Sequence, residues 1–194
     1  MGNPEVAQLE FLSRTFGELI REFKPASLVV LGSATGNGFE RIQQESVRKL
    51  IALDINQEYV NICRERFEEK IPCLELVCAD IASFEIEEAS TDFVYAGLFL
   101  EYVDPVMVLE KASRWLRPLG IFAAVLQLPG TSHGKVSETV FASLKRLEPV
   151  MRLVDPGRLV NLAGRHGFST VKSETVALAS GKEFFVGVYR LEVS

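Results

Sequence analysis

The 194-residue sequence predicts an α/β fold with a doubly wound sheet. First, the branched apolar run at residues 27–31 is typical of a strand buried on both faces, as in a parallel sheet. Second, strand-like and helix-like segments alternate as far as residue 126, which favours right-handed crossovers between parallel strands. Third, residues 180–182 are too few for a helical crossover, so the two strands they join must be antiparallel neighbours.

Each element follows from its own pattern. Apolar residues recur at helical spacing from Val6 to Phe23, and Pro25 ends this amphipathic helix. Pro118, Leu119 and Gly120 predict a turn. Residues 129–134 are expected to form a loop. We expect further helices at 39–47, 59–69, 106–116, 135–148 and 155–163, and further strands at 49–53, 74–78, 92–96, 121–126, 169–178 and 183–192.

The chain shows no internal repeat and no linker, so we expect one domain over residues 1–194. Its three parts are an N-terminal helix at 1–25, a core at 26–128, and further helices with the final antiparallel strands at 129–194. At this length a chain buries about 70% of its unfolded surface, which is enough for a core without disulfides or metals.

Composition excludes several classes of protein. A content of 47% hydrophobic and 24% charged residues is typical of a globular protein, and a net charge of -5 without a basic patch argues against nucleic acid as a partner. No apolar run approaches the about 20 residues that span a membrane, and no signal sequence is visible. Three cysteines without metal-ligand spacing indicate reduced thiols in a cytoplasmic protein and no metal site. A mean hydropathy of +0.15 leaves room for a homodimer interface.

A glycine-rich segment, residues 32–38, directly follows the first predicted strand. In a doubly wound sheet this is the carboxyl end of the strand, where ligands bind, and a following helix would offer free N–H groups. The spacing G-x-x-x-G-x-G fits neither the dinucleotide fingerprint nor a phosphate-binding P-loop. The alternative is a tight turn that binds no ligand.

Acidic residues follow the next two strands. Asp54 could accept hydrogen bonds from the two hydroxyls of a ribose, although capping of a helix is an equally good reading. Asp80 could accept from the exocyclic amine of adenine while the backbone N–H of Ile81 reaches a ring nitrogen. The fourth strand ends at Gly97 and Leu98. Four neighbouring strand ends thus each offer a group that suits a nucleoside.

The segment 28–126 resembles the core of class I S-adenosylmethionine-dependent methyltransferases. Residues 28–38 match the signature V-L-D-L-G-C-G-T-G-x-G, residues 92–103 match D-V-V-x-A-x-x-V-L-E-H-V, and residues 116–120 are similar to L-K-P-G-G. The resemblance implies a seven-stranded, mostly parallel sheet with an antiparallel last strand, helices on both faces, and S-adenosylmethionine as cofactor. On this resemblance the cofactor contacts are Gly32, Ser33, Ala34, Gly36, Gly38, Asp54, Ile55, Asp80, Ile81, Gly97 and Leu98.

Two residues depart from the family pattern. Val30 stands where the family usually has an acidic residue that orients the methionine end of the cofactor. Without that residue the site lacks a charge-assisted hydrogen bond of about 1.5–3 kcal/mol, which corresponds to roughly ten- to a hundredfold in cofactor affinity. Ala34 replaces the middle glycine, which a turn accepts provided that the φ angle is negative. We therefore expect weakened cofactor binding.

The acceptor is expected to be a small molecule. Residues 96–99 lack the polar side chain found in enzymes that methylate DNA bases or glutamine amides. Positioning alone can lower a methyl-transfer barrier by about 7–11 kcal/mol, so a protein base is needed only for a protonated acceptor. Candidates for that base are His133, Glu101 and Tyr102; the alternatives are a mobile loop residue, a salt-bridged surface carboxylate and a half-buried aromatic.

The leading hypothesis is a methyltransferase whose acceptor site lies between the N-terminal helix and residues 129–156. The alternative is a module that binds S-adenosylmethionine without catalysis, as a regulatory or partner subunit. A nicotinamide-dependent oxidoreductase is disfavoured by the glycine spacing.

Overall fold

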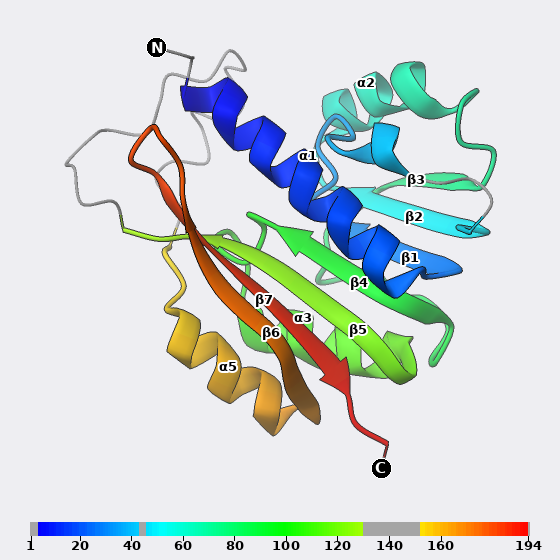
Figure 1. Cartoon of the computed structure of the whole chain (residues 1–194). Helices are drawn as coiled ribbons and strands as arrows, with labels where there is room; N and C mark the ends of the chain where they lie inside the picture. Colours follow the sequence, from blue (N-terminus) through cyan, green and yellow to red (C-terminus); the bar gives the residue numbers. More distant parts are fainter. Residues whose placement is uncertain (1–3, 43–45, 130–151, 194) are drawn as a thin grey trace.

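The computed structural model describes residues 4–42, 46–129 and 152–193. Its centre is a seven-stranded sheet in the order β3-β2-β1-β4-β5-β7-β6, in which only β7 runs antiparallel to its neighbours (Figure 1). This confirms the predicted fold class. The strands are β1 (Ser27–Leu31), β2 (Lys49–Asp54), β3 (Leu74–Cys78), β4 (Thr91–Gly97), β5 (Leu116–Gln127), β6 (Phe168–Ala177) and β7 (Glu183–Leu191).

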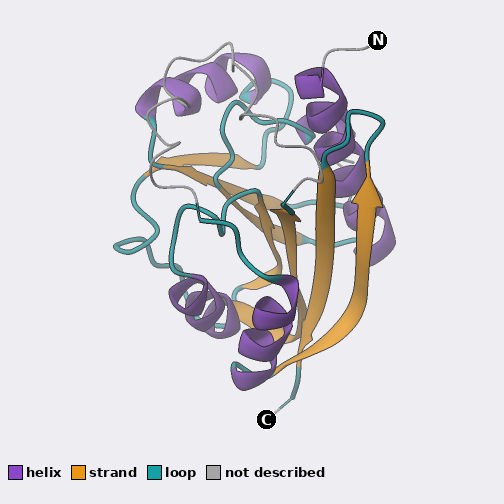
Figure 2. Cartoon of the chain, turned by 90° about the vertical axis from the view of Figure 1, so that its left-hand side faces the viewer, coloured by secondary structure: helices purple, strands orange, loops and turns teal. Residues whose placement is uncertain are grey.

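Helices cover both faces of the sheet (Figure 2). Apolar side chains of α1 and α2 bury one face with Leu28 and Val30 of β1, whereas α3 and α5 bury the other with Val29 and Leu31. All five residues of β1 are buried, as a central parallel strand requires. The described helices are α1 (Pro4–Phe23), α2 (Gln57–Phe67), α3 (Pro105–Trp115) and α5 (Pro156–Arg165), with a 3₁₀ turn, η1, at Phe39–Arg41.

Side-chain caps set the starts of three helices. The carboxylate of Asp104 accepts the amide of Val106 ahead of α3, and that of Asp155 accepts the amide of Arg158 ahead of α5. A proline at the first position of each of these two helices adds a preset φ angle. Asn56 caps α2 through the amide of Glu58, so this helix begins two residues before the predicted start.

The expected helix at 39–47 is wrong. Only the three-residue turn η1 follows the glycine-rich loop, and residues 43–45 lie outside the described residues. Gly38 enters the turn at φ 93°, and Ile42 leaves it with extended backbone, so no helical hydrogen-bond ladder continues. A turn this short has no macrodipole, and the loop therefore does not end in the anion-binding helix that the sequence suggested.

The expected turn at 118–120 is also wrong, because β5 begins at Leu116 and runs through these residues. The pairing jumps from Thr91 opposite Leu116 to Phe93 opposite Ile121, so the start of β5 bulges out of register. Leu119 lies in this bulge at φ 67°. The expected helix at 135–148 and most of the expected loop at 129–134 lie outside the described residues.

The amphipathic helix α1 packs on the sheet through aromatic rings. Phe11 stacks on Phe184 with ring centroids 5.0 Å apart, and Phe16 meets Tyr95 edge-on at 5.0 Å. These phenylalanines belong to the core, as expected. Within the described ranges, no helix combines the length and the apolar character that a membrane span needs.

Gly36→Ala tests how closely α2 packs on the loop. Gly36 has φ 80°, and a Cβ there would lie 2.8 Å from the ring of Phe67 and 2.9 Å from the sulfur of Cys63. Left-handed strain costs about 1–2 kcal/mol and overpacking about 1–3 kcal/mol, so urea denaturation should show a loss of at least about 2 kcal/mol.

Gly164→Ala is the matched control, because nothing lies within 4 Å of a Cβ in that exposed position of α5. It should stabilise the protein by about 0.5–1 kcal/mol. Equal stability of the two variants would contradict the packing argument.

Candidate functional site

The carboxyl ends of β1, β2 and β4 meet at one edge of the sheet. Leu31, the last residue of β1, pairs with Leu53 on one side and with Ala96 on the other. One residue further along, the same register places Gly32 between Asp54 and Gly97. Hydrogen bonds continue past the strands, from the amide of Ser33 to Leu53 and from the amide of Leu98 to Val125. The sheet thus brings together the residues that the sequence singled out at these three strand ends.

Asp54 ties the glycine-rich loop to the end of β2. Its Oδ2 accepts the amide of Ala34 at 2.8 Å, and its Oδ1 accepts the amide of Asn56 at 2.9 Å. Partial burial raises the pKa of Asp54, while the amides of Asn56 and Ala34 oppose the shift. A carboxylate has about four lone-pair positions, so two further donors can still bind. The cap of α2 is Asn56, so the reading of Asp54 as the helix cap is wrong; its carboxylate instead supports the turn before the helix. The ribose-binding reading stays a prediction.

Ala34 lies in the left-handed region at φ 46°, so the expectation of a negative φ is wrong. The bond to Asp54 holds the residue there, at a cost of about 1 kcal/mol or more relative to glycine. Leu98, after β4, has φ 52°. Two strained residues therefore flank Gly32 at the same edge, and such strain gathers at functional sites.

Two apolar side chains flank the line of strand ends. Ile55 follows Asp54 and is 67% exposed, which is unusual for an isoleucine. The ring of Phe99 lies against Gly32, where a Cβ would come within 2.6 Å of it. Only glycine at position 32 leaves room for this ring, a role that the sequence analysis missed because Phe99 follows a different strand.

Asp80 and Ile81 lie beyond the end of β3. The carboxylate of Asp80 accepts the amide of Ala82 at 2.9 Å, which forms a tight local turn, and the residue remains exposed. The side chain of Ile81 is buried in the core, so only its backbone faces the edge. Their neighbour Ala79 links this segment to the end of β2, because its amide donates to the carbonyl of Asp54.

Glu101 is buried and lies in a turn before α3, so its reading as a salt-bridged surface carboxylate is wrong. Its Oε1 accepts the amide of Gln127 at 2.8 Å, whereas its Oε2 has no hydrogen-bond partner among the described residues. Burial raises the pKa of Glu101 to about 7, although the amide of Gln127 opposes the shift. No described cation pairs with it. A carboxyl group that titrates near neutrality can exchange protons at physiological pH.

The other two base candidates are less informative. Tyr102 is half-buried, as expected, and its pKa is raised by burial and then by the nearby Glu101 and Tyr59. A raised pKa disfavours the phenolate that a base would need. His133 lies outside the described residues.

Val30 occupies the position that is usually acidic in the methyltransferase signature matched by residues 28–38. It is buried in the apolar cluster under α1. Nearby, the hydroxyl of Ser33 is buried without a hydrogen-bond partner among the described residues. An unpaired buried hydroxyl is costly, so it marks a place where a polar ligand group would be stabilising. No three histidine, cysteine or acidic side chains gather into a metal site within the described part of the chain.

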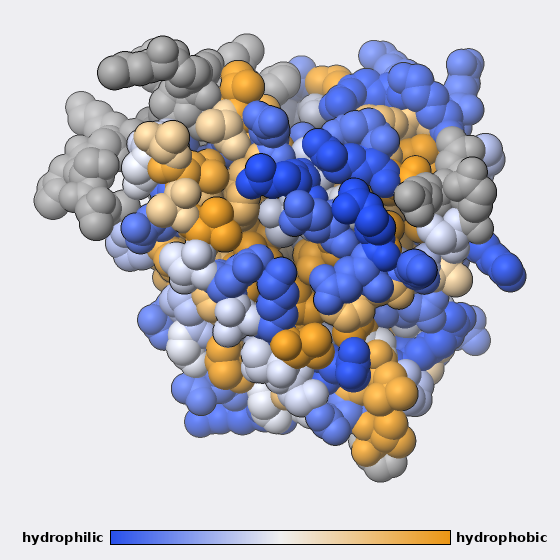
Figure 3. Space-filling model, in the orientation of Figure 1, coloured by the Kyte–Doolittle hydropathy of each residue, from blue (hydrophilic) through white to orange (hydrophobic). Residues whose placement is uncertain are grey.

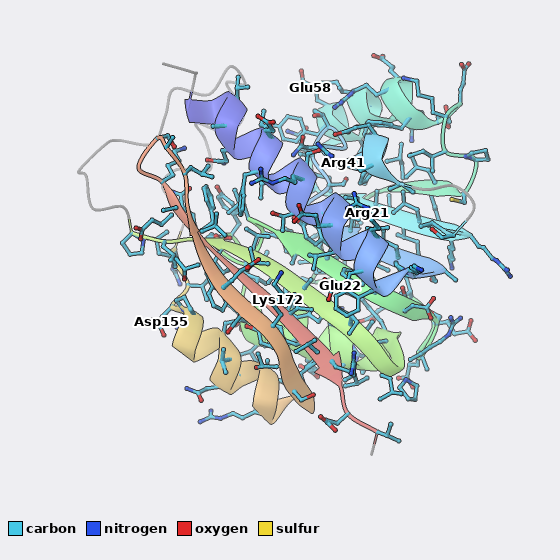
Figure 4. The ribbon with its side chains drawn as sticks, in the orientation of Figure 1. Arg21, Glu22, Arg41, Glu58, Asp155 and Lys172 are labelled. Carbon is cyan, nitrogen blue, oxygen red and sulfur yellow. The ribbon has the colours of Figure 1, made fainter. Side chains whose placement is uncertain are left out.

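Helix α1 is fastened over the glycine-rich loop by polar contacts. Arg41, from the turn after the loop, reaches α1 and donates through Nε to the hydroxyl of Ser13 at 2.7 Å (Figure 4). Ser13 in turn donates to Glu40 at 2.7 Å, and the side chain of Asn37 donates to the carbonyl of Leu9 at 3.0 Å. Burial raises the pKa of Glu40, but the hydrogen bond from Ser13, the backbone amides of Glu40 and Gly38, and the charge of Arg41 together outweigh burial and leave the pKa lowered. Sequence spacing gave no signal for this network.

Comparison with known families decides the affiliation. Residues 29–124, from β1 into β5, match the model of a methyltransferase domain family. The chain belongs to this methyltransferase family. The match contains the glycine-rich loop, Asp54, Asp80 and the segment after β4, which confirms the class I resemblance. No curated protein matches the sequence.

Solved structures share the fold of this methyltransferase domain at low identity. A putative S-adenosylmethionine-dependent methyltransferase from Listeria monocytogenes has a TM-score of 0.72 and 11% identity, covering 95% of this chain and 100% of its own. The N-methyltransferase NodS from Bradyrhizobium japonicum, in complex with S-adenosyl-L-homocysteine, has a TM-score of 0.69 and 12% identity, with 93% and 87% covered. The [4+2]-cyclase SpnF has a TM-score of 0.74 and 15% identity, with 94% and 81% covered. The fold alone therefore does not fix the reaction.

The buried carboxyl of Glu101 predicts a pH-dependent stability. Its folded pKa of about 7 lies above the ordinary value of 4.5, so between these values the native state keeps a proton that the unfolded chain has released. Stability must then fall as the pH rises through this window, by about 3 kcal/mol in total. Glu101→Gln keeps an acceptor for Gln127 and cannot ionise, so this part of the slope should disappear.

Urea denaturation at about pH 5 and about pH 8 measures the slope. Glu110→Gln, at an exposed position of α3, is the control and should keep the wild-type slope. An unchanged slope in Glu101→Gln would show that Glu101 titrates normally.

Proposed function

We propose that this methyltransferase domain transfers a methyl group from S-adenosylmethionine to a small-molecule acceptor. The observation that carries the proposal is the placement of Asp54 at the carboxyl edge, where two backbone amides orient a carboxylate that retains free lone pairs. Family membership supports methyl transfer in general.

The residues present fit an adenosine. Asp54 would accept from the two ribose hydroxyls, and the exposed side chain of Ile55 would cover one face of the base. Asp80 and the backbone N–H of Ile81 would read the adenine edge. The side chain of Ile81 is buried in the core, which leaves its backbone N–H as the group that would contact adenine.

The methionine end has a different donor set from the family pattern. Val30 supplies no charge, so the backbone around Gly32 and the unpaired hydroxyl of Ser33 would hold the amino-acid group. Phe99 lies against Gly32 and would form an apolar wall beside the sulfur. We expect affinity to rest mainly on the adenosine contacts.

When bound, S-adenosylmethionine supplies an electrophilic methyl group on a sulfonium. The chain has to hold an acceptor in line with it and to keep water out, and the apolar side chains of Leu98 and Phe99 suit that task. For an acceptor that arrives protonated, Glu101 is the base that we propose, because its carboxyl lies at the end of β5, on the amide of Gln127, with Oε2 unpaired among the described residues. Burial also raises its pKa to about 7.

A module that binds the cofactor without catalysis is the second candidate. Two observations favour it: the core packing of Val30 in place of a charge, and the ring of Phe99 beside Gly32. It predicts binding without transfer.

Calorimetry with S-adenosylhomocysteine tests the assignment of Asp54. Asp54→Asn keeps the size of the side chain but removes the charge-assisted acceptor, so affinity should fall by about tenfold or more. Glu58→Gln, which removes one exposed charge from the first turn of α2, should bind within about twofold of the wild type. Equal affinity of Asp54→Asn and the wild type would refute the site. Tight binding of NADH would instead support the oxidoreductase.

Transfer itself is tested with a donor that carries a labelled methyl group and a fractionated mixture of small metabolites. Label should move into at least one fraction with wild-type protein and with Glu58→Gln, and should be lost with Asp54→Asn. Binding that is intact in calorimetry while no fraction is labelled would favour the module without catalysis.

A further inference from the structure

A cavity of about 410 Å³ opens at the amino edge of the sheet, opposite the carboxyl edge. Its walls come from the end of α1, the starts of β4 and β5, and the end of β7. Buried side chains of Pro25, Phe93 and Ile121 line it, and Phe23 and Leu119 stand at its rim. The volume is in the usual range for a small-molecule site. The proposed cofactor and acceptor do not account for this cavity, because they bind beyond the carboxyl ends of the strands.

The charges that line this cavity are unbalanced. Arg117 donates to Asp92 at 2.7 Å, and the second oxygen of Asp92 accepts the amides of Ala26 and Ser27 at 3.0 and 2.9 Å. The carboxylate of Asp92 is thus committed to the fold. Arg190 also lines the cavity and has no acidic partner among the described residues. Arg190 is exposed at the cavity, so its guanidinium is the lining charge that remains available to an anion.

Leu119 is a separate sign that this edge has a function. Its φ of 67° is strained for a leucine, and the resembling L-K-P-G-G motif has glycine at this position. The side chain is also 59% exposed, so the free energy of its burial does not offset the backbone strain. Strained backbone of this kind clusters at ligand-binding and other functional sites. The face below α1 shows apolar surface interspersed with charged groups (Figure 3).

We propose that this cavity binds a small organic anion with an apolar body and one carboxylate. The accessible side chains of Phe23, Pro118 and Leu119 would pack on the apolar part, and Arg190 would pair with the carboxylate, to which guanidinium geometry is well suited. The site lies at the edge of the sheet opposite Asp54, so the proposal does not rest on methyl transfer.

The test follows backbone amide shifts of ¹⁵N-labelled protein while 3-phenylpropanoate is added, with the neutral 3-phenylpropanamide as the comparison ligand. The carboxylate should cause saturable shifts at Phe93, Gly120 and Ile121, and the amide should bind about tenfold more weakly. Arg190→Gln should weaken the binding of 3-phenylpropanoate by a similar factor. Arg158→Gln, at an exposed position of α5 on the face of the sheet opposite α1, should leave the affinity for 3-phenylpropanoate unchanged.

Leu119→Gly separates binding from folding. Because glycine accepts φ 67° without strain, the melting temperature should stay the same or rise, while carboxylate binding weakens. Equal binding by Arg190→Gln and wild type, shifts that map to Gly32 or Gly97, or no saturable shifts would each overturn the proposal. Self-association that Leu119→Gly abolishes would overturn it in favour of a contact between two copies of the chain.

Discussion

The hydrogen bonds of Asp54 are the interaction on which the carboxyl edge depends. One carboxylate oxygen holds the amide of Ala34 in the loop after β1, and the other holds the amide of Asn56, the cap of α2. Two connections that leave neighbouring strands are thereby fixed to a single side chain. Because Ala34 is strained in its left-handed conformation, the bond also maintains a loop shape that alanine alone would not favour.

Packing fixes the rest of this edge. The loop is pressed between α2 at Gly36 and α1 at Gly38, where a Cβ would lie 2.8 Å from Phe67 and 3.0 Å from Phe16. The glycines therefore serve helix approach as well as ligand approach. This explains how the loop keeps its course although only a 3₁₀ turn follows it, since neighbouring helices hold it from two sides.

The strands could be predicted from the sequence because buried parallel strands leave short apolar runs, such as residues 27–31. Of their arrangement, the sequence predicted the antiparallel pair joined by 180–182, because a connection this short dictates its pairing. The starts of α3 and α5 were predicted to within one residue, at 106 and 155. The helix after Gly38 was mispredicted because apolar spacing at Phe39, Ile42 and Val47 also suits a turn that packs under α1. The site residues at strand ends were found by position, whereas the burial of Glu101 and the contact of Phe99 with Gly32 depend on tertiary packing that no local pattern records.

Residues with strained backbone lie at both edges of the sheet, but in different local structures. At the carboxyl edge, Ala34 and Leu98 are strained where the chain turns around Gly32, and hydrogen bonds to Asp54 and Val125 hold them. At the amino edge, Leu119 is strained in a bulge that exposes its side chain. Strand β4 joins the two, since Asp92 at its start binds Arg117 and the amides before β1, and Gly97 at its end adjoins Gly32. Because this buried strand pairs with β1 and β5 between the two edges, a ligand at either edge would meet a surface shaped before it arrives, which lowers the ordering cost of binding.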